Sequence, residues 1–565
     1  MAKKQFKAES KRLLDLMINS IYTHQEIFLR EIISNASDAI DKLAYQALTD
    51  EKVGLNRSDF AIQLKVDEPS RTLTVSDNGI GMDHDELENN LGTICKSGSL
   101  QFKKDMEKQD DIDIIGQFGV GFYSAFMVAD TVTVISRKYG SDEAWKWTSS
   151  GADGYTMEPA ERESAGTDVI MTLKADTEDE QYSRFLKTWE LQKLVKKYSD
   201  YIRYPIKLEM EKSRMKEETK DSDKPEYETY TENETLNSMV PLWQRAKKDI
   251  TPEEYNNFYK EKFFDFEDPI ATIHVSVEGA VTYKALLYIP ARAPYDFYTK
   301  DFKKGLQLYS SGVMIMENCE ELLPDCFRFV RGVVDSQDLS LNISREMLQH
   351  DRQLKFIAGN LEKKIKAELA KLMEQDREKY EKFYAAFGMQ IKYGVLNDYG
   401  AKKELLQDLL LYWSHKQNKL VSFKEYVDAM PEEQKYIYFA SGENRQRLAQ
   451  LPQLEKLGEK GFDVLLMTDE VDSFVPQTLG KYAEKDFRSV TQEDLGLSTE
   501  EEKKEAAEQA EKSKATLEFV KTTLGDDVKE VRLSENLGTH PVCMVPEEGM
   551  TFEMEKYFKR LNPGM

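Results

Sequence analysis

Apolar residues recur at helical spacing near the start of the chain, in QEIFLREIISNASDAIDKL, residues 25–43. On a helical wheel the segment has one broad apolar sector and two polar strips, which predicts an amphipathic helix. The apolar sector holds Phe28, Leu29, Ile32, Ile33, Ala36, Ala39, Ile40 and Leu43. One strip holds Glu26, Arg30, Ser37 and Asp41, and the other holds Glu31, Asn35, Asp38 and Lys42. Two interpretations remain open: the strips form one solvated face, or the second strip lines a pocket.

A second pattern follows in RTLTVSDNGIGMDHDELENNLGTICKSGS, residues 71–99, which begins with the alternation of a strand. Asn78-Gly79 is typical of a hairpin, but no second strand follows. Asp83 and Glu86 instead have capping-box spacing, and Met82 with Leu87 has the spacing of a hydrophobic staple. The segment therefore predicts strand, loop and helix, with Asp77 at the strand end beside glycines. A carboxylate there can accept a hydrogen bond from an exocyclic amine of a flat ring.

Further elements follow from the same patterns. Residues 211–236 are polar and charged and predict a short linker or an exposed hairpin. TIHVSVEGAVTYKALLYIP, residues 272–290, predicts two strands, and a long helix is expected from Ser344 toward Met373. Residues 434–469 predict strand, helix and strand, and residues 498–524 predict a charged helix. A last amphipathic helix is predicted over residues 549–561.

Composition narrows the class of protein. The chain has 565 residues, which predicts three or four domains, and a net charge of −24, which opposes binding to nucleic acid. The four cysteines show no paired spacing, so we expect a reduced setting without a zinc site. The N-terminus does not have the pattern of a secretory signal, and no apolar run reaches the ~18 residues of a membrane span. These features predict a soluble cytoplasmic protein without a membrane partner.

A glycine-rich segment, IIGQFGVGFYSAFMVAD at residues 114–130, supplies the candidate chemistry. Gly116, Gly119 and Gly121 precede an apolar run that predicts a helix from Phe122 to Val128. Backbone amides at such a turn suit phosphate oxygens. The alternative is a tight turn with close packing, since this spacing alone is weak evidence.

Together, in this order, the acidic helix, D-N-G-x-G-M and G-x-x-G-x-G resemble the Bergerat-type ATP-binding fold. Type II topoisomerases, sensor histidine kinases, mismatch-repair MutL and the ninety-kilodalton heat-shock-protein chaperones share this fold. The residues in and around these motifs resemble those of the chaperones, and of their bacterial branch in particular. This resemblance extends almost from Phe6 to the chain end. The segments that carry this resemblance are FLREIISNASDA, SDNGIGM, NNLGTICKSG, IGQFGVGFYSAFMVAD, PLWQRAKKDIT, LYIPARAPYDFY and RFVRGVVDSQDLSLNISREMLQ.

The resemblance implies roles for individual residues. Asp77 binds the adenine amine beside Gly81, and Thr167 assists through water. The nucleoside packs against Met82, Leu91 and Phe122. Asn35 helps to coordinate Mg²⁺, and Asp38 and Lys42 flank the sugar and phosphates. The phosphates are held by Asn90, Lys96 and the backbone of Gly119, Val120, Gly121 and Phe122.

Catalysis and client binding are implied in the same way. Glu31 orients or deprotonates the attacking water. Arg345 reaches the γ-phosphate from the middle domain; from the residues alone, pairing with Glu346 or another carboxylate is the alternative. An adaptable client-binding face is expected at Met550, Met554, Tyr557 and Phe558, with burial in its own domain as the alternative.

The resemblance implies an α/β fold with three domains and a linker. A sandwich of helices on a mixed sheet binds ATP at 1–212, and a charged linker spans 213–236. An α/β/α middle domain covers 237–495 (parts 237–345, 346–418 and 419–495), and a small mixed C-terminal domain covers 496–565. We expect the last domain to be incomplete, and the chain therefore to be monomeric or weakly dimeric where full-length relatives are homodimers.

The implied function is an ATP-dependent chaperone with slow ATP hydrolysis, which remodels unfolded or partly folded clients, with a seventy-kilodalton heat-shock chaperone system as a further partner. Three alternatives remain. A topoisomerase or mismatch-repair ATPase needs a basic DNA surface, and a histidine kinase normally places its ATP domain after a phosphoacceptor helix. A holdase that has lost catalysis does not need both Glu31 and Arg345.

Overall fold

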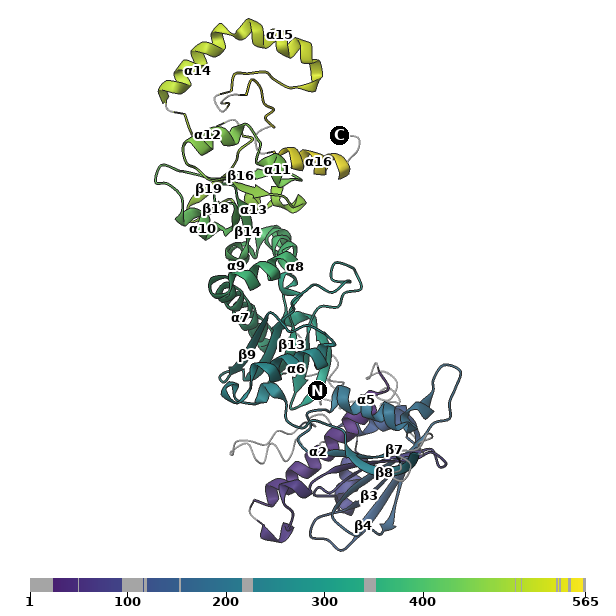
Figure 1. Cartoon of the computed structure of the whole chain (residues 1–565). Coiled ribbons are helices and arrows are strands. Elements are labelled where there is room, and N and C mark those ends of the chain that lie inside the picture. Colours follow the sequence, from purple (N-terminus) through teal and green to yellow (C-terminus); the bar gives the residue numbers. More distant parts are fainter. Residues whose placement is uncertain are drawn as a thin grey trace, which may run out of the picture. The chain divides into compact units, whose positions relative to one another are not determined.

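The computed structural model describes residues 24–48, 50–93, 115, 119–151, 154–215, 227–339, 352–492, 494–498, 500–534, 537, 540–546 and 550–561. The chain divides into two compact units. Unit 1 comprises Met1–Tyr288, Lys303–Leu323 and Val330–Leu361, and unit 2 comprises Ile289–Phe302, Pro324–Phe329 and Glu362–Met565. Each unit combines helices with mixed sheets, so the predicted α/β class is confirmed (Figure 1).

Unit 1 contains an eight-stranded sheet with the order β5-β4-β3-β6-β2-β1-β7-β8. Most neighbours are antiparallel, while β1 and β7 are parallel. The strands are β1 (Ile62–Asp67), β2 (Thr72–Asp77), β3 (Ala129–Arg137), β4 (Ala144–Ser149), β5 (Tyr155–Ala160), β6 (Gly166–Leu173), β7 (Ile206–Met215) and β8 (Tyr227–Thr235). The helices are α2 (Ile27–Gln46), α3 (His84–Leu91), α5 (Thr188–Tyr198) and the 3₁₀ helix η3 (Gly121–Met127).

A second, five-stranded sheet in unit 1 has the order β12-β11-β13-β10-β9 and follows helix α6 (Pro252–Phe263). Its strands are β9 (Ala271–Val277), β10 (Tyr283–Ile289), β11 (Leu306–Ser310), β12 (Val313–Cys319) and β13 (Arg331–Asp335). The two strands predicted over residues 272–290 are therefore confirmed as β9 and β10. Within residues 211–236, the described ends form the paired strands β7 and β8, as the hairpin interpretation requires.

Unit 2 contains a six-stranded sheet with the order β15-β14-β17-β16-β19-β18. Its strands are β14 (Leu411–Ser414), β15 (Lys419–Ser422), β16 (Ile437–Ser441), β17 (Leu465–Met467), β18 (Lys481–Tyr482) and β19 (Lys485–Ser489). Its helices are α8 (Arg377–Leu396), α9 (Lys403–Leu406), α10 (Phe423–Asp428), α11 (Arg445–Leu448), α12 (Gln453–Glu459) and α13 (Val475–Leu479). Helix α7 (Arg352–Gln375) spans the boundary between the units.

The chain beyond residue 499 contributes α14 (Glu500–Lys512), α15 (Lys514–Leu524) and α16 (Phe552–Leu561). The single charged helix predicted over 498–524 is therefore two helices, which meet at Ser513. The strand, helix and strand predicted over 434–469 are confirmed as β16, α11 with α12, and β17, with parallel strands.

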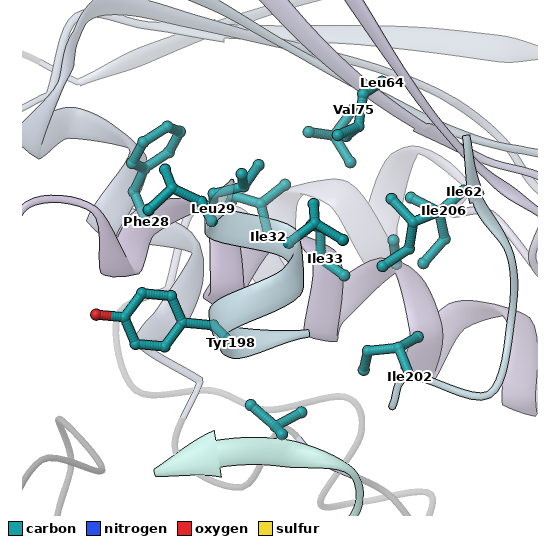
Figure 2. Close-up of a cluster of buried hydrophobic side chains, with 14 of the residues drawn as sticks. Phe28, Leu29, Ile32, Ile33, Ile62, Leu64, Val75, Tyr198, Ile202 and Ile206 are labelled. Atoms are coloured by element: carbon teal, nitrogen blue, oxygen red, sulfur yellow. The ribbon is translucent and has the colours of Figure 1, made fainter. Parts of the chain in front are cut away.

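Helix α2 packs its apolar sector on the first sheet, and this packing fixes the helix that carries the candidate site. Phe28, Leu29, Ile32 and Ile33 lie against Leu64 and Val75, while Tyr198 and Ile202 lie on another side of the helix (Figure 2). Burying one such aliphatic or aromatic side chain stabilises the fold by roughly 1.5–3 kcal/mol.

The polar strips of α2 are buried as well, so the interpretation as one solvated face is wrong. Arg30, Glu31, Ser37, Asp38 and Asp41 are all buried, and Asn35 is the one strip residue in the exposed class. The first strip meets other parts of unit 1. Tyr204 donates a 2.6 Å hydrogen bond to Asp41 Oδ1, and Lys197 donates a 3.1 Å bond to Glu26 Oε1.

Candidate functional site

Asp77 lies buried at the end of β2, where the strand pattern predicted it. It lies opposite Thr167 of the neighbouring strand β6, and its Oδ1 accepts a 2.9 Å hydrogen bond from the Gly79 amide. Burial raises the pKa of Asp77 to about 7, although the hydrogen bond from Gly79 and the charge of Arg162 oppose that rise. A buried carboxyl with this pKa is stabilised by a ligand that donates a hydrogen bond to it.

The loop after Asp77 is fixed by close backbone approach to α2. A Cβ on Gly79 would lie 2.4 Å from the carbonyl carbon of Ala39, so only glycine fits there. The Ile80 amide donates a 3.0 Å hydrogen bond to the Ala39 carbonyl. The D-N-G segment therefore docks on the same helix that carries Glu31, Asn35 and Asp38.

Helix α3 begins as the sequence predicted. Asp83 accepts a 2.9 Å hydrogen bond from the Glu86 amide, and the Asp83 amide donates a 3.1 Å bond to Glu86 Oε2. Lys138 donates 2.8 Å bonds to both carboxylates. This cap orients the face of α3 where Asn90 Nδ2 lies 3.8 Å from Met82 Sδ. Leu91, at the end of α3, is buried, and its carbonyl accepts a 2.9 Å bond from the Tyr123 hydroxyl.

The site has two ends, which we call poles. Asp77 and its loop form the first pole, and Glu31 with the glycine turn forms the second. Both hydrogen bonds from the Arg30 guanidinium, at 2.7 and 3.0 Å, reach its Oε1. Its Oε2 faces Gly121, because a Cβ on that glycine would lie 2.5 Å from the oxygen. Arg30 also donates a 3.4 Å bond to the Met314 carbonyl, and both members of the pair are buried. Glu31 is therefore held in one orientation beside the turn.

The other residues of the second strip differ in exposure. Asp38 is buried and accepts a 2.8 Å hydrogen bond from the Ile115 amide. Burial lowers the pKa of Lys42, against the charges of Asp38 and Glu86. Asn35 is exposed and lies one turn after Glu31. The strip thus offers a buried carboxylate, an amine and an open amide at successive turns.

The glycine turn leads into η3 rather than the predicted α-helix from Phe122 to Val128. Gly119 has a φ of +64°, and the 3₁₀ helix runs from Gly121 to Met127 with Val120 before it. The Phe122 ring packs edge-on against Tyr123 and Trp147, with centroids 5.6 Å away in each case. Tertiary packing of these aromatic rings fixes the tighter turn.

Several predicted residues are not brought into this site. Gly116, Lys96 and Arg345 lie outside the described residues. On α16, Met554 is only 3% exposed, whereas Phe558 is 44% exposed and its ring lies 6.2 Å from Phe474. The predicted client face is therefore partly packed within unit 2, and Met554 is not accessible on it. Met550 and Tyr557 are partly buried.

Two supporting residues escaped the sequence patterns. Ser136 on β3 shares a 2.8 Å hydrogen bond with the Thr167 hydroxyl and accepts a 2.9 Å bond from the Met82 amide. Arg162 donates a 2.9 Å bond to the Asp77 carbonyl and pairs with Asp168 at 3.2 Å. Both residues form hydrogen bonds with groups around Asp77. Neither belongs to a short sequence motif, so no local pattern pointed to them.

The two poles are spaced for an elongated ligand. Ala39, which carries the Asp77 loop, and Glu31 are eight residues apart on α2, roughly 12 Å along the axis. One pole offers a buried acceptor for a ring amine, and the other offers glycine backbone and a fixed carboxylate. This arrangement suits a nucleotide with its base at Asp77 and its phosphates at the turn.

Among the described residues, no helix is both long and apolar enough to cross a membrane.

Comparisons with known proteins agree with this geometry. Residues 22–194 match the family described as histidine kinase-, DNA gyrase B-, and HSP90-like ATPase, and residues 216–562 match the family described as Hsp90 protein. Chaperone protein HtpG of Bacillus subtilis is 55% identical over 556 residues, which cover 98% of this chain and 88% of that protein. Chaperone protein HtpG of Clostridium acetobutylicum is 56% identical over 561 residues, or 99% of this chain and 89% of that protein. The chain therefore belongs to the Hsp90 family and is an ATP-dependent molecular chaperone that hydrolyses ATP.

Proposed function

We propose that α2 aligns ATP between Asp77 and the glycine turn. The observation that carries this proposal is that one helix holds both poles, through Ala39 at the adenine end and Glu31 at the phosphate end. Asp77 accepts the adenine amine, Thr167 assists, and Gly81, Met82, Leu91 and Phe122 surround the nucleoside. Asn90, Lys96 and the Gly119–Phe122 backbone hold the phosphates, with Asp38 and Lys42 beside them.

Glu31 orients the attacking water in this proposal. The Arg30 guanidinium donates two hydrogen bonds to Glu31 Oε1, which hold the carboxylate in one orientation. Oε2, on the side of Gly121, accepts a hydrogen bond from the water. Positioning and neutralisation of charge supply most of the catalysis in phosphoryl transfer.

The surroundings of Glu31 also suit Mg²⁺. This cation prefers oxygen ligands, keeps several waters, and usually binds through one or two protein groups together with substrate phosphates. Asn35 is exposed one turn from Glu31, and its side chain carries an oxygen of the required kind. Mg²⁺ neutralises phosphate charge when bound.

The remaining steps of the ATPase cycle are proposed from the membership of the chain in the Hsp90 family. We propose that Arg345 approaches the γ-phosphate from the middle domain, within the domain organisation predicted from the sequence. Unfolded or partly folded clients are the proposed substrates, with self-association and a seventy-kilodalton chaperone system as further partners. The proposed compartment is the cytoplasm, in keeping with Cys319, Cys326 and Cys543, which are free thiols.

Glu31→Gln and Asp77→Asn, made in the full chain, test these roles. Glu31→Gln should bind ATP normally and hydrolyse it ~100-fold more slowly, the lower range of general-base effects. The amide keeps an oxygen for Arg30, so the buried cation is not left unpaired. Asp77→Asn should lose ATP binding in isothermal titration, because its amide group opposes the adenine amine.

Glu88→Gln is the matched control, since Glu88 is exposed on α3. It should leave both binding and steady-state ATP hydrolysis unchanged. Wild-type turnover by Glu31→Gln, or tight ATP binding by Asp77→Asn, would remove the assigned role of that residue.

A further inference from the structure

A crevice in unit 2, remote in sequence from the ATP site, lies where two chain connections diverge. Strands β16 and β17 are adjacent and parallel. β16 continues through α11 and α12 to β17 on one side, whereas β17 continues through α13 to β19 on the other side of β16. Parallel crossovers are right-handed with few exceptions, so the two connections leave toward opposite faces of the sheet.

Packing within unit 2 agrees with this divergence. Leu448 and Leu457, from α11 and α12, share one apolar cluster with Tyr438 of β16 and Leu466 of β17. Helix α13 packs instead against α8. In α/β sheets, ligands bind in the crevice outside the carboxyl ends of strands at such a point.

A cavity of about 500 Å³ lies there. Its lining includes Arg445 after β16 and Asp469 and Asp472 after β17, with Lys392 from α8 and Tyr412 and Trp413 from β14. This volume falls in the range of small-molecule sites, roughly 300–1,000 Å³.

The inner part of the cavity carries one excess negative charge. Lys392 Nζ lies 2.6 Å from Asp469 Oδ2 and 2.7 Å from Asp472 Oδ1. Lys392 and Asp472 are buried. One ammonium therefore faces two carboxylates, which leaves the group suited to a second cation.

The rim carries an arginine that stacks on an aromatic ring. The Arg445 guanidinium lies 3.7 Å from the centroid of the Trp413 ring. Within the part of the chain that the structure describes, no carboxylate pairs with Arg445. The carboxylate of Glu443, which also lines the cavity, lies 3.5 Å from Lys556, and Lys556 pairs more closely, at 2.8 Å, with Glu553. Stacking on an indole leaves the N–H edge of a guanidinium available to an anion.

Two phenol groups also lack partners. Tyr412 is only 2% exposed, and its hydroxyl has no hydrogen bond of normal geometry among the described residues. Burial raises the pKa of Tyr412, and the Asp472 carboxylate close to its hydroxyl adds to that rise. The hydroxyl of Tyr384, also in the lining, is buried and unpartnered too. A buried hydroxyl without a partner costs about 1–3 kcal/mol, so an occupant that satisfies both is favoured.

We propose that this crevice binds a small zwitterionic molecule, with its ammonium group at Asp469 and Asp472 and its carboxylate or phosphate group at Arg445. The phenol oxygens of Tyr384 and Tyr412, which lie near Asp472, accept hydrogen bonds from the ammonium group. The carboxylates of Asp469 and Asp472 at one end of the cavity and the guanidinium of Arg445 at the other match such a molecule in sign and order.

Isothermal titration of the full chain tests this with four probes, each with and without excess ADP. Phosphoethanolamine and 4-aminobutyrate carry both charges, with a phosphate or a carboxylate as the anion. Inorganic phosphate and ethanolamine carry one charge each. We expect one of the zwitterions to bind 1:1 and at least ~10-fold more tightly than either single-charge probe, as expected when a charge-assisted contact is lost. ADP should change nothing, because the ATP site is separate.

Arg445→Gln and Asp469→Asn should each weaken the preferred zwitterion by ~10-fold or more. Arg447→Gln is the matched control, since Arg447 is exposed on the same helix but does not line the cavity. The Trp413 indole resonance, assigned through Trp413→Phe, should shift on binding. Absence of binding by both zwitterions would make ordered water the occupant and overturn the proposal. Equal affinity for a single-charge probe, or equal effects of Arg445→Gln and Arg447→Gln, would overturn it as well.

Discussion

At the scale of single residues, the carboxyl of Asp77 links burial to ligand binding. Its pKa is raised to about 7 because burial disfavours the charged form. The folded chain therefore binds a proton between about pH 4 and 7 that the unfolded chain has released. The contribution of Asp77 to folding free energy consequently falls as pH rises through this window. A ligand that donates to the carboxylate offsets this loss.

Nucleoside binding should therefore depend on pH. The affinity for adenosine should be constant above pH 8 and should fall below pH 7, approaching ~10-fold per pH unit as Asp77 becomes protonated. Adenosine is the probe because it lacks phosphates that titrate in the same range. Isothermal titration between pH 5.5 and 8.5 measures the change. A flat profile across that range would show that the charged form of Asp77 does not bind the ring.

Gly121 sets the position of Glu31 by contact. A methyl group at residue 121 would lie 2.5 Å from Glu31 Oε2, so Gly121→Ala must displace the carboxylate or the turn. We expect ATP turnover to fall by ~10-fold or more, since misplaced catalytic groups lose most of their effect. Gly279→Ala is the control, because a methyl group at Gly279 meets nothing within 4 Å. Steady-state hydrolysis unchanged in Gly121→Ala would show that this contact does not position Glu31.

At the scale of elements, the spacing of residues in the sequence predicted those features that depend on residues close together in the chain. The capping box of α3 and the apolar sector of α2 follow from spacing along one helix, and both are confirmed. The burial of the polar strips of α2 does not follow from spacing, because it depends on partners far along the chain. Arg30 contacts the Met314 carbonyl, 284 residues away, and Asp41 contacts Tyr204. Ser136 and Arg162 were missed for the same reason.

The 3₁₀ conformation of η3 also escaped prediction. Its residues suit an α-helix by composition, but the glycine turn before it and the contacts of Phe122 with Trp147 constrain its start. Of the residues predicted for the nucleotide, those that the structure describes lie on or beside α2, β2, α3, η3 and β6. Their order along the chain was informative because each motif combined a structural signal with a chemical group.

Helix α16 gives a prediction at this scale. Phe558→Ser should weaken capture of an unfolded client while leaving the melting temperature nearly unchanged, because Phe558 is 44% exposed. Met554→Ser should instead lower stability by about 2–5 kcal/mol, as buried Met truncations do. Lys559→Ser, an exposed change on the same helix, controls for surface polarity. Normal client capture by Phe558→Ser, measured as suppression of aggregation, would exclude this face.

At the scale of the whole molecule, the resemblance decided the function where the physics of the residues could not. The charge of −24 argued against a DNA-dependent ATPase, but the Hsp90 match over residues 216–562 and the HtpG relatives separate the chaperones from other users of the ATP-binding fold. Client binding leaves no motif as specific as D-N-G-x-G-M, because adaptable surfaces tolerate many sequences. The ATP-binding motifs therefore allow a prediction for each residue, whereas the client surface offers no such motif.

Arg345 is the residue through which the middle domain should act on ATP. In the full chain, Arg345→Ala should bind ATP with wild-type affinity but hydrolyse it on the order of 100-fold more slowly, the effect of removing one group that stabilises transition-state charge. Arg352→Ala, a change of the same type at an exposed arginine at the start of α7, should hydrolyse ATP normally. Single-turnover hydrolysis under saturating ATP separates the chemical step from binding. Wild-type single-turnover rates in Arg345→Ala would mean that the arginine pairs with a carboxylate of its own domain and has no part in hydrolysis.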